Sequence, residues 1–491
     1  MSSENGVIFQ FFHYKYKTGG FLWKELETEA ANLGQKGVTA IWFPPPYKGA
    51  GGGFDVGYGA YDLFDLGEFP QKGTTPTKYG TRGELEAALT EVKNAKMQAY
   101  VDTVFNHKTG GDYTELVHAC EVDWNDRNRV YGCRDIRIFS HFKFKGRRDN
   151  SDDSNYSSME WHWWHFDSAD WDNLRKEKKL YRLKDKVFET PVSPENGNYD
   201  YLLGVDLDTR HPEVDGELRY WGRWIVDNLG VNGFRIDAVK HIRSEYFKDW
   251  LNHLRVHFSG RSLFAVGEYW SGNPDDLHGY ISATEGTLSV FDVPLHYRFF
   301  SASNSGSSYD MRTILDRTLM KEQPAKAVTF VDNHDTQPGE KLESWVEPWF
   351  KPLAYALILL RKEGYPCIFY GDYYGDRYTR DDGLDATMYS HKFLIDQFLI
   401  ARKAYGFGDQ HDYFDHPNTI GWTRLGNSDH PGSMAVVLTN GGDGYKWMNM
   451  FRTNAQYTDI TGHIGNIVTT NSDGWGKFPC LGGKVSVWLQ Q

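Results

Sequence analysis

Short apolar runs alternate with amphipathic helical patterns along most of the chain. Runs of strand length lie at 7–12, 38–43, 99–104, 233–236, 263–266, 288–291, 327–331 and 367–370. Helical periodicity follows or separates them at 22–33, 82–96, 215–229, 244–258, 311–319, 352–362 and 394–404. This strand–helix alternation predicts an α/β fold with a parallel sheet, and the eight strand-length runs match a closed (β/α)₈ TIM barrel. The alternative is an open doubly wound sheet, but no Gly-x-Gly-x-x-Gly opens any of the helices.

This alternation is interrupted twice. Residues 108–209 show no clean strand–helix pattern, and so long a structureless stretch is uncommon inside a compact domain, which predicts an inserted small domain after the third strand. Beyond 404, short apolar segments at 420–424, 434–439 and 485–489 are separated by Asn, Gly and Asp clusters, which is typical of an antiparallel β-sandwich. We therefore expect a barrel from 1–107 and 210–404, an inserted small domain from 108–209 and a β domain from 405–491.

The charge balance limits the partners. Lys and Arg number 54 against 66 Asp and Glu, so the net charge is 54 − 66 = −12, and an acidic chain repels the phosphates of a nucleic acid. No stretch approaches the roughly 18 apolar residues of a membrane-spanning helix, so we expect no membrane partner. The start of the sequence has neither a basic n-region nor an apolar h-region. This favours a cytoplasmic location, with a secreted protein whose signal was removed as the alternative.

The four cysteines, at 120, 133, 367 and 480, form no Cys-x-x-Cys pair, so the sequence indicates neither a zinc site nor a redox motif. Cys120 and Cys133 are close enough in sequence for a loop disulfide. We expect two free thiols instead, which agrees with a cytoplasmic location.

A cation and a carboxylate share one face of the strand at 233–236. Side chains two apart on a strand point the same way, so Arg235 and Asp237 should project together. A neighbouring guanidinium favours the ionised carboxylate, lowering its pKa, and a nucleophile needs that ionised form. Taken alone, the pair is better explained as a structural ion pair, because most Arg–Asp pairs are only structural.

Two further apolar strands end in acids. The run at 263–266 is followed by Glu268, and the run at 327–331 is followed by Asp335. Because the carboxyl ends of the strands in a parallel barrel meet at one mouth, where such barrels build their active sites, we expect Asp237, Glu268 and Asp335 to converge there.

The segments that carry these acids resemble a known family. Residues 102–107 (Asp-Thr-Val-Phe-Asn-His), 233–241 (Gly-Phe-Arg-Ile-Asp-Ala-Val-Lys-His), 267–268 (Gly-Glu) and 330–335 (Phe-Val-Asp-Asn-His-Asp) resemble, in order, the four signature regions of the α-amylase family of glycoside hydrolases. The likeness extends across essentially the whole chain. Through 56–63 and 349–355 it is nearest to the bacterial liquefying and cytoplasmic α-amylases.

The resemblance implies Asp237 as nucleophile, Glu268 as general acid/base and Asp335 as the carboxylate that stabilises the transition state. A retaining glycosidase uses one carboxylate to attack the anomeric carbon and one acid to protonate the leaving oxygen, with the carboxyls roughly 5 Å apart. A third carboxylate favours the positively charged transition state. The implied activity is endo-acting, retaining hydrolysis of α-1,4-glucosidic bonds in starch, glycogen or maltodextrins through a covalent glycosyl-enzyme intermediate.

Two other functions use the same scaffold. A transglycosylase or branching enzyme forms the same intermediate, and the signature residues do not separate water from a sugar hydroxyl as the acceptor. A non-catalytic carbohydrate-binding relative would have lost its acids, whereas this sequence keeps all three.

Residues around these acids are the predicted substrate contacts. In the resemblance His107 and His334 hydrogen-bond the sugar, and flat aromatic rings cover its apolar face. The predicted set is Tyr14, Tyr58, His107, Arg235, Lys240, His241, His334 and Trp270. Each has a structural alternative, as a satisfied core histidine, a surface residue of the turn or a packing aromatic. Tyr14 stands where close relatives usually carry tryptophan, so the stacking surface is expected to differ there.

The resemblance also implies calcium. Asn106, Asp200 and Asp206, with the backbone carbonyl of His241, resemble the family's structural Ca²⁺ site between barrel and inserted domain, and Ca²⁺ takes six to eight oxygen ligands. The alternative is that the two aspartates are solvated loop acids.

A second cation lies near the residues equivalent to Asp167, Glu189 and Asp208 in liquefying relatives. Glu189 stands where they carry aspartate and Arg210 replaces another acid, so we expect the guanidinium to take the place of that cation. The expected partner is an α-glucan, and the expected state is a monomer.

Overall fold

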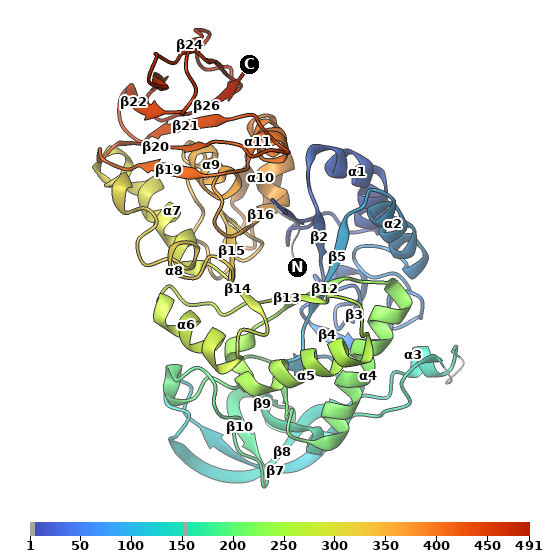
Figure 1. Cartoon of the computed structure of the whole chain (residues 1–491). Helices are drawn as coiled ribbons and strands as arrows, with labels where there is room; N and C mark the ends of the chain where they lie inside the picture. The colour runs from blue at the N-terminus through green and yellow to red at the C-terminus, as the bar shows by residue number, and fades with distance from the viewer. Residues whose placement is uncertain (1–4, 152–154) are drawn as a thin grey trace.

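The computed structural model describes residues 5–151 and 155–491; the start of the sequence and residues 152–154 of the predicted inserted domain lie outside these ranges. Eight parallel strands close into a barrel in the order β1-β16-β15-β14-β13-β12-β5-β2 (Figure 1). Their bounds are β1 Ile8–Gln10, β2 Ala40–Phe43, β5 Gln98–Thr103, β12 Gly233–Ile236, β13 Phe264–Gly267, β14 Ser289–Phe291, β15 Ala327–Phe330 and β16 Tyr365–Phe369. The predicted (β/α)₈ barrel is confirmed, since each expected strand forms within a few residues of its predicted bounds.

Helices follow the barrel strands around the outside. They are α1 Leu22–Lys36, α2 Arg82–Asn94, α4 Pro212–Leu229, α5 Ser244–His257, α6 Pro274–Ala283, α7 Val293–Ser305, α8 Leu319–Glu322, α9 Lys351–Leu360, α10 Tyr370–Tyr374 and α11 Lys392–Tyr405. In α4, a buried stripe at Val214, Leu218, Trp221, Ile225 and Leu229 recurs every three to four residues and packs into the core. Gly230 ends that helix with a φ of 65°, a conformation that glycine adopts at little cost.

One predicted helix is wrong, and two of the longer helices were not predicted. Residues 311–319 form a 3₁₀ turn (Met311–Thr313) and only then enter the short α8. The side chains of Asp310 and Thr318 each cap a separate helical start, which leaves room for about one turn between them. Helices α6 and α7 were missed, and both begin with a proline in their first turn after an Asn or Asp cap.

The chain segment between β5 and α4 forms a six-stranded sheet with the strand order β6-β11-β9-β10-β7-β8. It lies at the bottom of Figure 1. Its strands are β6 His107–Lys108, β7 Tyr113–Val122, β8 Val130–His141, β9 Phe166–Asp172, β10 Glu177–Leu183 and β11 Val205–Leu207, and α3 (Lys145–Arg148) follows β8. The prediction of two free thiols in this region is wrong. Strands β7 and β8 pair as a hairpin whose register sets Cys120 opposite Cys133, and the two form a disulfide. Spacing along the chain did not reveal that cross-strand register.

The C-terminal strands form an antiparallel sheet, β19-β20-β21-β26-β23-β24, beside a second pair, β22-β25 (Figure 1). Their bounds are β19 Gln410–Tyr413, β20 Thr419–Arg424, β21 Met434–Thr439, β22 Gly444–Asn449, β23 Gln456–Asp459, β24 Val468–Thr469, β25 Trp475–Cys480 and β26 Val485–Gln490. Along β21, Val436 belongs to the core shared with the barrel, and its neighbours Ala435 and Val437 to a separate core. Alternate residues of one strand thus fill two layers, as expected for a sandwich.

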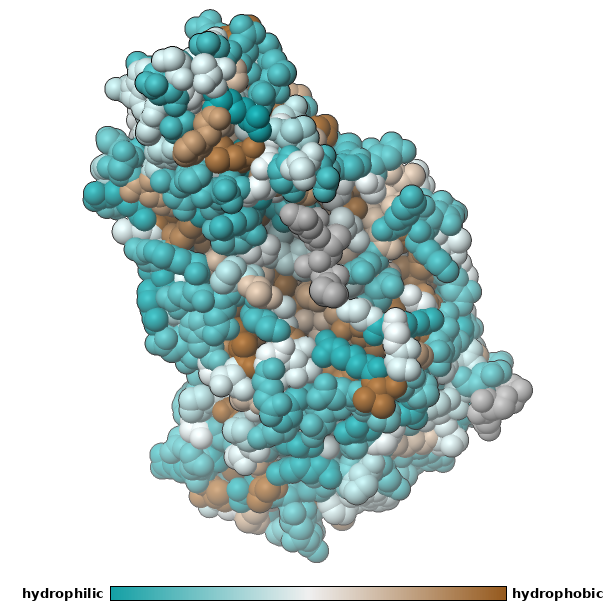
Figure 2. Space-filling model, viewed as in Figure 1, coloured by the Kyte–Doolittle hydropathy of each residue, from teal (hydrophilic) through white to brown (hydrophobic). Residues whose placement is uncertain are grey.

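Two further short strand pairs lie outside these sheets. Small two-stranded sheets join β3 (Lys48–Gly49) to β4 (Ala60–Asp62) and β17 (Asp376–Thr379) to β18 (Asp385–Met388). Figure 2 shows hydrophilic side chains over most of one face, with smaller apolar patches between them. Among the described residues, none of the helices has the length and apolar character needed to cross a bilayer.

Candidate functional site

The acids of neighbouring strands β12 and β13 lie side by side because of the barrel's register. Ile236 pairs with Gly267, so Asp237 and Glu268 each stand one residue beyond a matched pair. The backbone N–H of Glu268 donates to the carbonyl of Ile236 at 2.9 Å, which fixes that register up to the acids. Asp335 lies in the loop that follows β15. All three therefore stand beyond the carboxyl ends of their strands, at one mouth of the barrel.

The Arg235 guanidinium joins three carboxylates. Its Nη1 donates to Asp237 Oδ1 at 2.7 Å and to Asp102 Oδ1 at 2.8 Å, and its Nη2 donates to Glu268 Oε2 at 2.8 Å. The arginine is 1% exposed, so these contacts are made away from bulk water. Such charge-assisted bonds are short and directional, and they fix the positions of the acids relative to one another.

Asp102 is a member of the site that the sequence reasoning did not single out. It lies within β5, fully buried, and its Oδ2 accepts hydrogen bonds from Trp42 Nε1 at 2.9 Å and from the Tyr58 hydroxyl at 2.7 Å. An acid inside an otherwise apolar strand was the available signal, because a buried carboxylate requires partners. Asp102 thus links Arg235 to the aromatic side of the site.

Burial dominates the proton affinity of the acids. It raises the pKa of Asp237 well above its ordinary value; Arg235 opposes the rise, while Glu268, Asp102 and Asp335 add to it. The expectation that Arg235 would lower this pKa is wrong in net direction, because it counted the guanidinium and neither burial nor the other acids. Burial, followed by repulsion from Glu268, also raises the pKa of Asp335 to about 7, although a fifth of its side chain stays exposed. Burial and the neighbouring acids thus favour the protonated forms of Asp237 and Asp335, whereas Arg235 favours the ionised form that a nucleophile needs.

His334 sits between Asp335 and the aromatic residues. Its Nδ1 accepts a hydrogen bond from the Gln10 amide at 2.9 Å, so the ring proton stands on Nε2, 3.3 Å from Asp335 Oδ2. Burial lowers the pKa of His334 well below its usual value, which keeps the ring neutral. The Tyr58 ring stacks on it with centroids 5.2 Å apart, and Tyr14 meets its edge at 4.6 Å. The two predicted stacking tyrosines and His334 thus form one aromatic cluster.

His107 is the first residue of β6, shortly after the end of β5, and it contacts Tyr58 of the same cluster. Its Nε2 donates to the carbonyl of Tyr58 at 2.9 Å, and burial lowers its pKa to about 4. The remaining nitrogen, Nδ1, is buried and has no hydrogen-bond partner among the described residues. A neutral imidazole with one unused acceptor suits a ligand that brings a hydroxyl group.

The other predicted contacts border the acids. Lys240 donates from Nζ to the carbonyl of Trp270 at 3.0 Å and to Glu195 Oε1 at 2.8 Å, which ties the end of β12 to the segment after β13. The His241 ring contacts Tyr199 with centroids 4.3 Å apart, and its Nδ1 lies 2.6 Å from the Tyr199 carbonyl. The Lys240 ammonium and the His241 ring therefore face other parts of the chain as well as the site.

A second group of acids lies between the barrel and the inserted sheet. Asp167, Asp200 and Asp206 are buried, and one oxygen of each lies within 4.8 Å of the others. Burial, with repulsion from Asp200, raises the pKa values of Asp167 and Asp206 well above the ordinary range. Burial, with repulsion from Glu189, raises the pKa of Asp200 to about 8. Asn106 donates to Asp206 at 2.8 Å, and its own Oδ1 is buried without a partner. The three buried carboxyls and the amide oxygen of Asn106, which has no partner among the described residues, fit a hard cation.

The remaining predicted ligands are satisfied by the protein itself. Glu189 Oε1 accepts from the backbone N–H of Thr209 at 2.8 Å. Asp208 accepts from Arg210 Nε and from Lys186 Nζ, each at 2.9 Å. Arg210 therefore stands beside Asp208 as the sequence suggested, and neither acid belongs to the group of three around Asp200.

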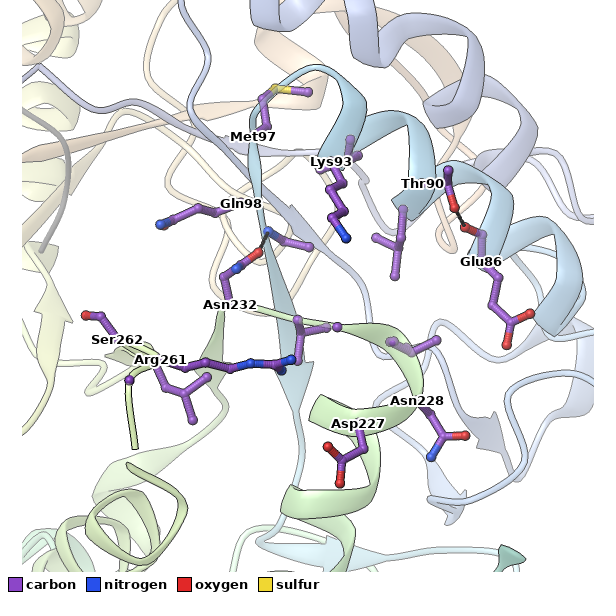
Figure 3. A pocket seen from close by; sticks show the side chains of 18 residues that line it. Glu86, Thr90, Lys93, Met97, Gln98, Asp227, Asn228, Asn232, Arg261 and Ser262 are labelled. Atoms are coloured by element: carbon purple, nitrogen blue, oxygen red, sulfur yellow. Dashed lines mark hydrogen bonds between the residues drawn. The ribbon is translucent and has the colours of Figure 1, made fainter. Parts of the chain in front are cut away.

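A cavity of about 920 Å³ lies at the opposite end of the barrel, where β5, β12 and β13 begin (Figure 3). Lys93 from α2, Asp227 from α4 and Arg261 before β13 line it. The side chain of Asn232 closes part of it by accepting from the backbone N–H of Ala99 at 3.0 Å. It is separated from the acids by the length of the barrel strands, and we place the candidate site at the mouth with the acids.

Comparisons with known proteins agree with this geometry. Residues 198–394 match the family model described as the alpha amylase catalytic domain, and 442–489 match the alpha-amylase C-terminal model. The chain is 50% identical to an alpha-amylase of Geobacillus stearothermophilus, covering 99% of this chain and 87% of the relative. It is 49% identical to a glucan 1,4-alpha-maltohexaosidase of Bacillus sp. (strain 707), covering 100% and 93%. With a cytoplasmic alpha-amylase of Escherichia coli the identity is 40%, covering 99% of each. A crystal structure of a Geobacillus thermoleovorans alpha-amylase complexed with acarbose shares the fold, with a TM-score of 0.63 and 15% identity over 100% of this chain and 99% of the other.

Proposed function

The chain belongs to the α-amylase family, and we propose that it hydrolyses α-1,4-glucosidic bonds of starch, glycogen or maltodextrins, cutting within the polymer and retaining the anomeric configuration. The observation that carries the proposal is that acids from three strand ends meet at one mouth of the barrel. Arg235 contacts Asp237 and Glu268, and burial and the charge of Glu268 raise the pKa of Asp335. Relatives of about half-identical sequence named alpha-amylase and maltohexaosidase support the same substrate class.

In the proposed mechanism Asp237 attacks the anomeric carbon while Glu268 protonates the leaving oxygen. The glycosidic bond breaks, a glycosyl ester forms on Asp237, and Glu268 is left as a carboxylate. That carboxylate then takes a proton from water, whose oxygen attacks the same carbon and releases Asp237. Arg235 contacts both side chains and positions them in each step. Asp335 lies where a negative charge would favour the positively charged sugar in the transition state.

The predicted contact residues are assigned by their unused polar atoms and faces. Nδ1 of His107 has no partner in the part of the chain that the structure describes, and it is available to accept from a sugar hydroxyl. His334, neutral and carrying its proton on Nε2, can donate to a hydroxyl that displaces Asp335. Tyr58 and Tyr14 form an aromatic surface beside them, and apolar sugar faces pack well on such rings. Lys240, His241 and Trp270 would border the adjoining sugars.

We infer that the cation of the second acid group is Ca²⁺. Asn106, Asp167, Asp200 and Asp206 would hold it, with the His241 carbonyl as the further ligand that the family resemblance implies, and carboxylate and amide oxygens are ligands that Ca²⁺ prefers. Bound there, Ca²⁺ would supply the positive charge that this buried group lacks. Glu189 and Asp208 are satisfied by protein donors, so we propose one cation here and not two.

Organisation and location follow the same proposal. We propose domains at 1–107 with 210–404, at 108–209 and at 405–491; the barrel strands fall within the first pair of segments, and the two family models match 198–394 and 442–489. We propose a monomer, which size-exclusion chromatography tests.

A cytoplasmic location is supported by the E. coli relative, whereas the Cys120–Cys133 disulfide is typical of oxidising compartments. Counting free thiols in protein isolated from each cell fraction decides between them.

The test is the change Asp237→Asn. Without a carboxylate to form the ester, the release of reducing ends from soluble starch should fall on the order of 10⁴-fold or more. Asp227→Asn, at the opposite end of the barrel, is the matched control and should keep full activity. Full activity in Asp237→Asn protein would refute the assignment.

A second incubation separates hydrolysis from transfer. Maltoheptaose should give only shorter products if water is the acceptor, and products longer than the substrate would identify a transglycosylase. If the native protein releases no reducing ends, a non-catalytic binding protein is the correct alternative.

A further inference from the structure

A second cluster of metal-type ligands lies in the inserted sheet, away from the carboxylate groups described above. His141 is the last residue of β8, and the next residue, Phe142, pairs with Trp161 through two backbone hydrogen bonds of 3.0 and 3.1 Å. In an antiparallel pair this sets His141 opposite His162, with Glu160 two residues from His162 on the same face. Phe142 and Trp161 are buried in the core, so the three polar side chains share the other, half-buried face.

The three side chains already lie close enough to surround one ion. One donor atom each of His141, Glu160 and His162 lies within 4.8 Å of the others. The two imidazole rings stack with centroids 4.4 Å apart, and His141 Nε2 lies 3.1 Å from Glu160 Oε2. A tetrahedral zinc site, with bonds near 2.0–2.1 Å, needs donors roughly 3.4 Å apart. Small rotations of half-buried side chains supply that change.

The surroundings orient two of the three ligands. Glu115 Oε1 accepts from His162 Nδ1 at 3.0 Å, which leaves Nε2 of that ring without a proton and free to bind a metal. Glu115 is itself held by the backbone N–H of Trp163 at 2.8 Å and the Ser140 hydroxyl at 2.6 Å. A carboxylate that fixes a histidine ligand through its far nitrogen is the usual support of a protein zinc ligand. Arg148 binds the other oxygen of Glu160, Oε1, so Oε2 remains for the cluster.

We propose that His141, His162 and Glu160 form a site for a divalent transition metal of the Zn²⁺ type, with Glu115 as the positioning residue and water in the fourth position. Two imidazoles and one carboxylate are a common zinc donor set, and imidazole nitrogen selects Zn²⁺, Ni²⁺ or Cu²⁺ over Ca²⁺. The bound ion would cross-link the end of β8 to the segment that leads into β9. A ligand that binds the folded state alone raises its stability, so the metal would stabilise the inserted sheet.

The test measures Zn²⁺ binding to the full chain by calorimetry in millimolar CaCl₂, so that the oxygen-rich group around Asp200 is kept out of the titration. The wild type should bind one equivalent that His162→Ala and His141→Ala each weaken at least about tenfold, and Glu115→Gln should weaken it roughly tenfold by removing the support of His162. Co²⁺ in place of Zn²⁺ should give visible absorption bands in the wild type that both histidine variants lose. Melting without zinc, compared with the wild type, shows which variants are folded, and either histidine variant suffices.

Two controls make the result specific. His118→Ala removes an exposed histidine of the same hairpin that contacts one carboxylate, Asp135, at 2.9 Å, and it should bind Zn²⁺ as the wild type does. His211→Ala removes a member of the other histidine cluster, with His165 and Glu213, and should also leave the binding unchanged. The proposal is overturned if the wild type binds no Zn²⁺, if His162→Ala and His141→Ala bind it like the wild type, or if His211→Ala alone abolishes the binding.

Discussion

Two groups of buried acids in this molecule solve the same electrostatic problem in different ways. At the mouth of the barrel, Asp102, Asp237 and Glu268 surround Arg235, which contacts all three at 2.7–2.8 Å. Between barrel and inserted sheet, three aspartates share a site, and the guanidinium of Arg210 approaches one of them, Asp167, at 3.5 Å. A buried charge without a partner costs several kcal/mol, so the first group is compensated by the chain and the second requires a cation from solution.

This difference suits the two tasks. A covalently attached guanidinium stays in place when substrate enters and leaves, and it holds both acids of the proposed reaction in one geometry. A cation from solution adds binding free energy to folding, because the assembled ligand set exists only in the folded chain. One group should therefore control activity, and the other should control stability.

The largest effect should follow removal of the Arg235 guanidinium, the cation that the chain itself supplies to the first group. Arg235→Met leaves three buried carboxylates uncompensated, so we expect a loss of about 3–5 kcal/mol in the free energy of unfolding and a fall in starch hydrolysis of roughly 10²-fold or more. Denaturant unfolding and reducing-end release measure the two effects. Arg235→Lys is the matched control: it keeps the charge but not the two-pronged geometry, so it should recover stability better than activity. Recovery of full activity in Arg235→Lys would contradict the positioning role.

The second-largest effect should follow removal of the calcium ion proposed for the three aspartates. With calcium at about 100 to 1,000 times its dissociation constant, a strong chelator should remove roughly 3–4 kcal/mol of stability and lower the melting temperature by several degrees. Asp200→Asn should melt at the same temperature with and without chelator, because the site has lost a charged ligand. A wild-type melting temperature that does not respond to the chelator would show that the three aspartates hold no cation.

The pH dependence of stability should differ between the two forms. Without calcium, burial and the neighbouring Glu189 raise the pKa of Asp200 from 3.8 to about 8, so the folded state binds more protons than the unfolded state between these values. The free energy of unfolding of the calcium-free protein should then fall as the pH rises from about 4 to about 8. Calcium holds the same acids ionised, so the loaded protein should lose less. The difference in melting temperature between protein with calcium and protein with chelator should therefore grow as the pH rises. A difference that stays constant with pH would contradict the account.

The same contrast shows what the sequence could predict. The positions of Asp237, Glu268 and Asp335 followed from strand-ending acids, because a parallel barrel brings strand ends together whatever the loops do. Arg235 and Asp237 were paired by the two-residue period of a strand. The resemblance to relatives placed Asp200 with Asp206 but assigned Asp167 to a second site with Glu189 and Asp208. The structure groups Asp167 with Asp200 and Asp206 instead. These acids come from separate strands and loops of the inserted sheet, whose pairing the sequence does not show.

The features that were missed depend on packing and register. Asp102 was overlooked because its partners Trp42 and Tyr58 come from distant segments. The pKa of Asp237 was expected to fall because one adjacent charge was visible in the sequence and burial was not. The Cys120–Cys133 disulfide required the register of the β7–β8 hairpin, which spacing along the chain does not show.

The most direct test of the account traps the intermediate on its predicted atom. In Glu268→Gln protein, α-maltosyl fluoride can still react, because fluoride leaves without protonation, but the ester should then persist for want of a base to activate water. Mass spectrometry of the intact protein followed by peptide mapping locates the sugar. The account predicts one maltosyl group esterified to Asp237, and a sugar attached to Asp335 or to any other carboxylate would contradict it.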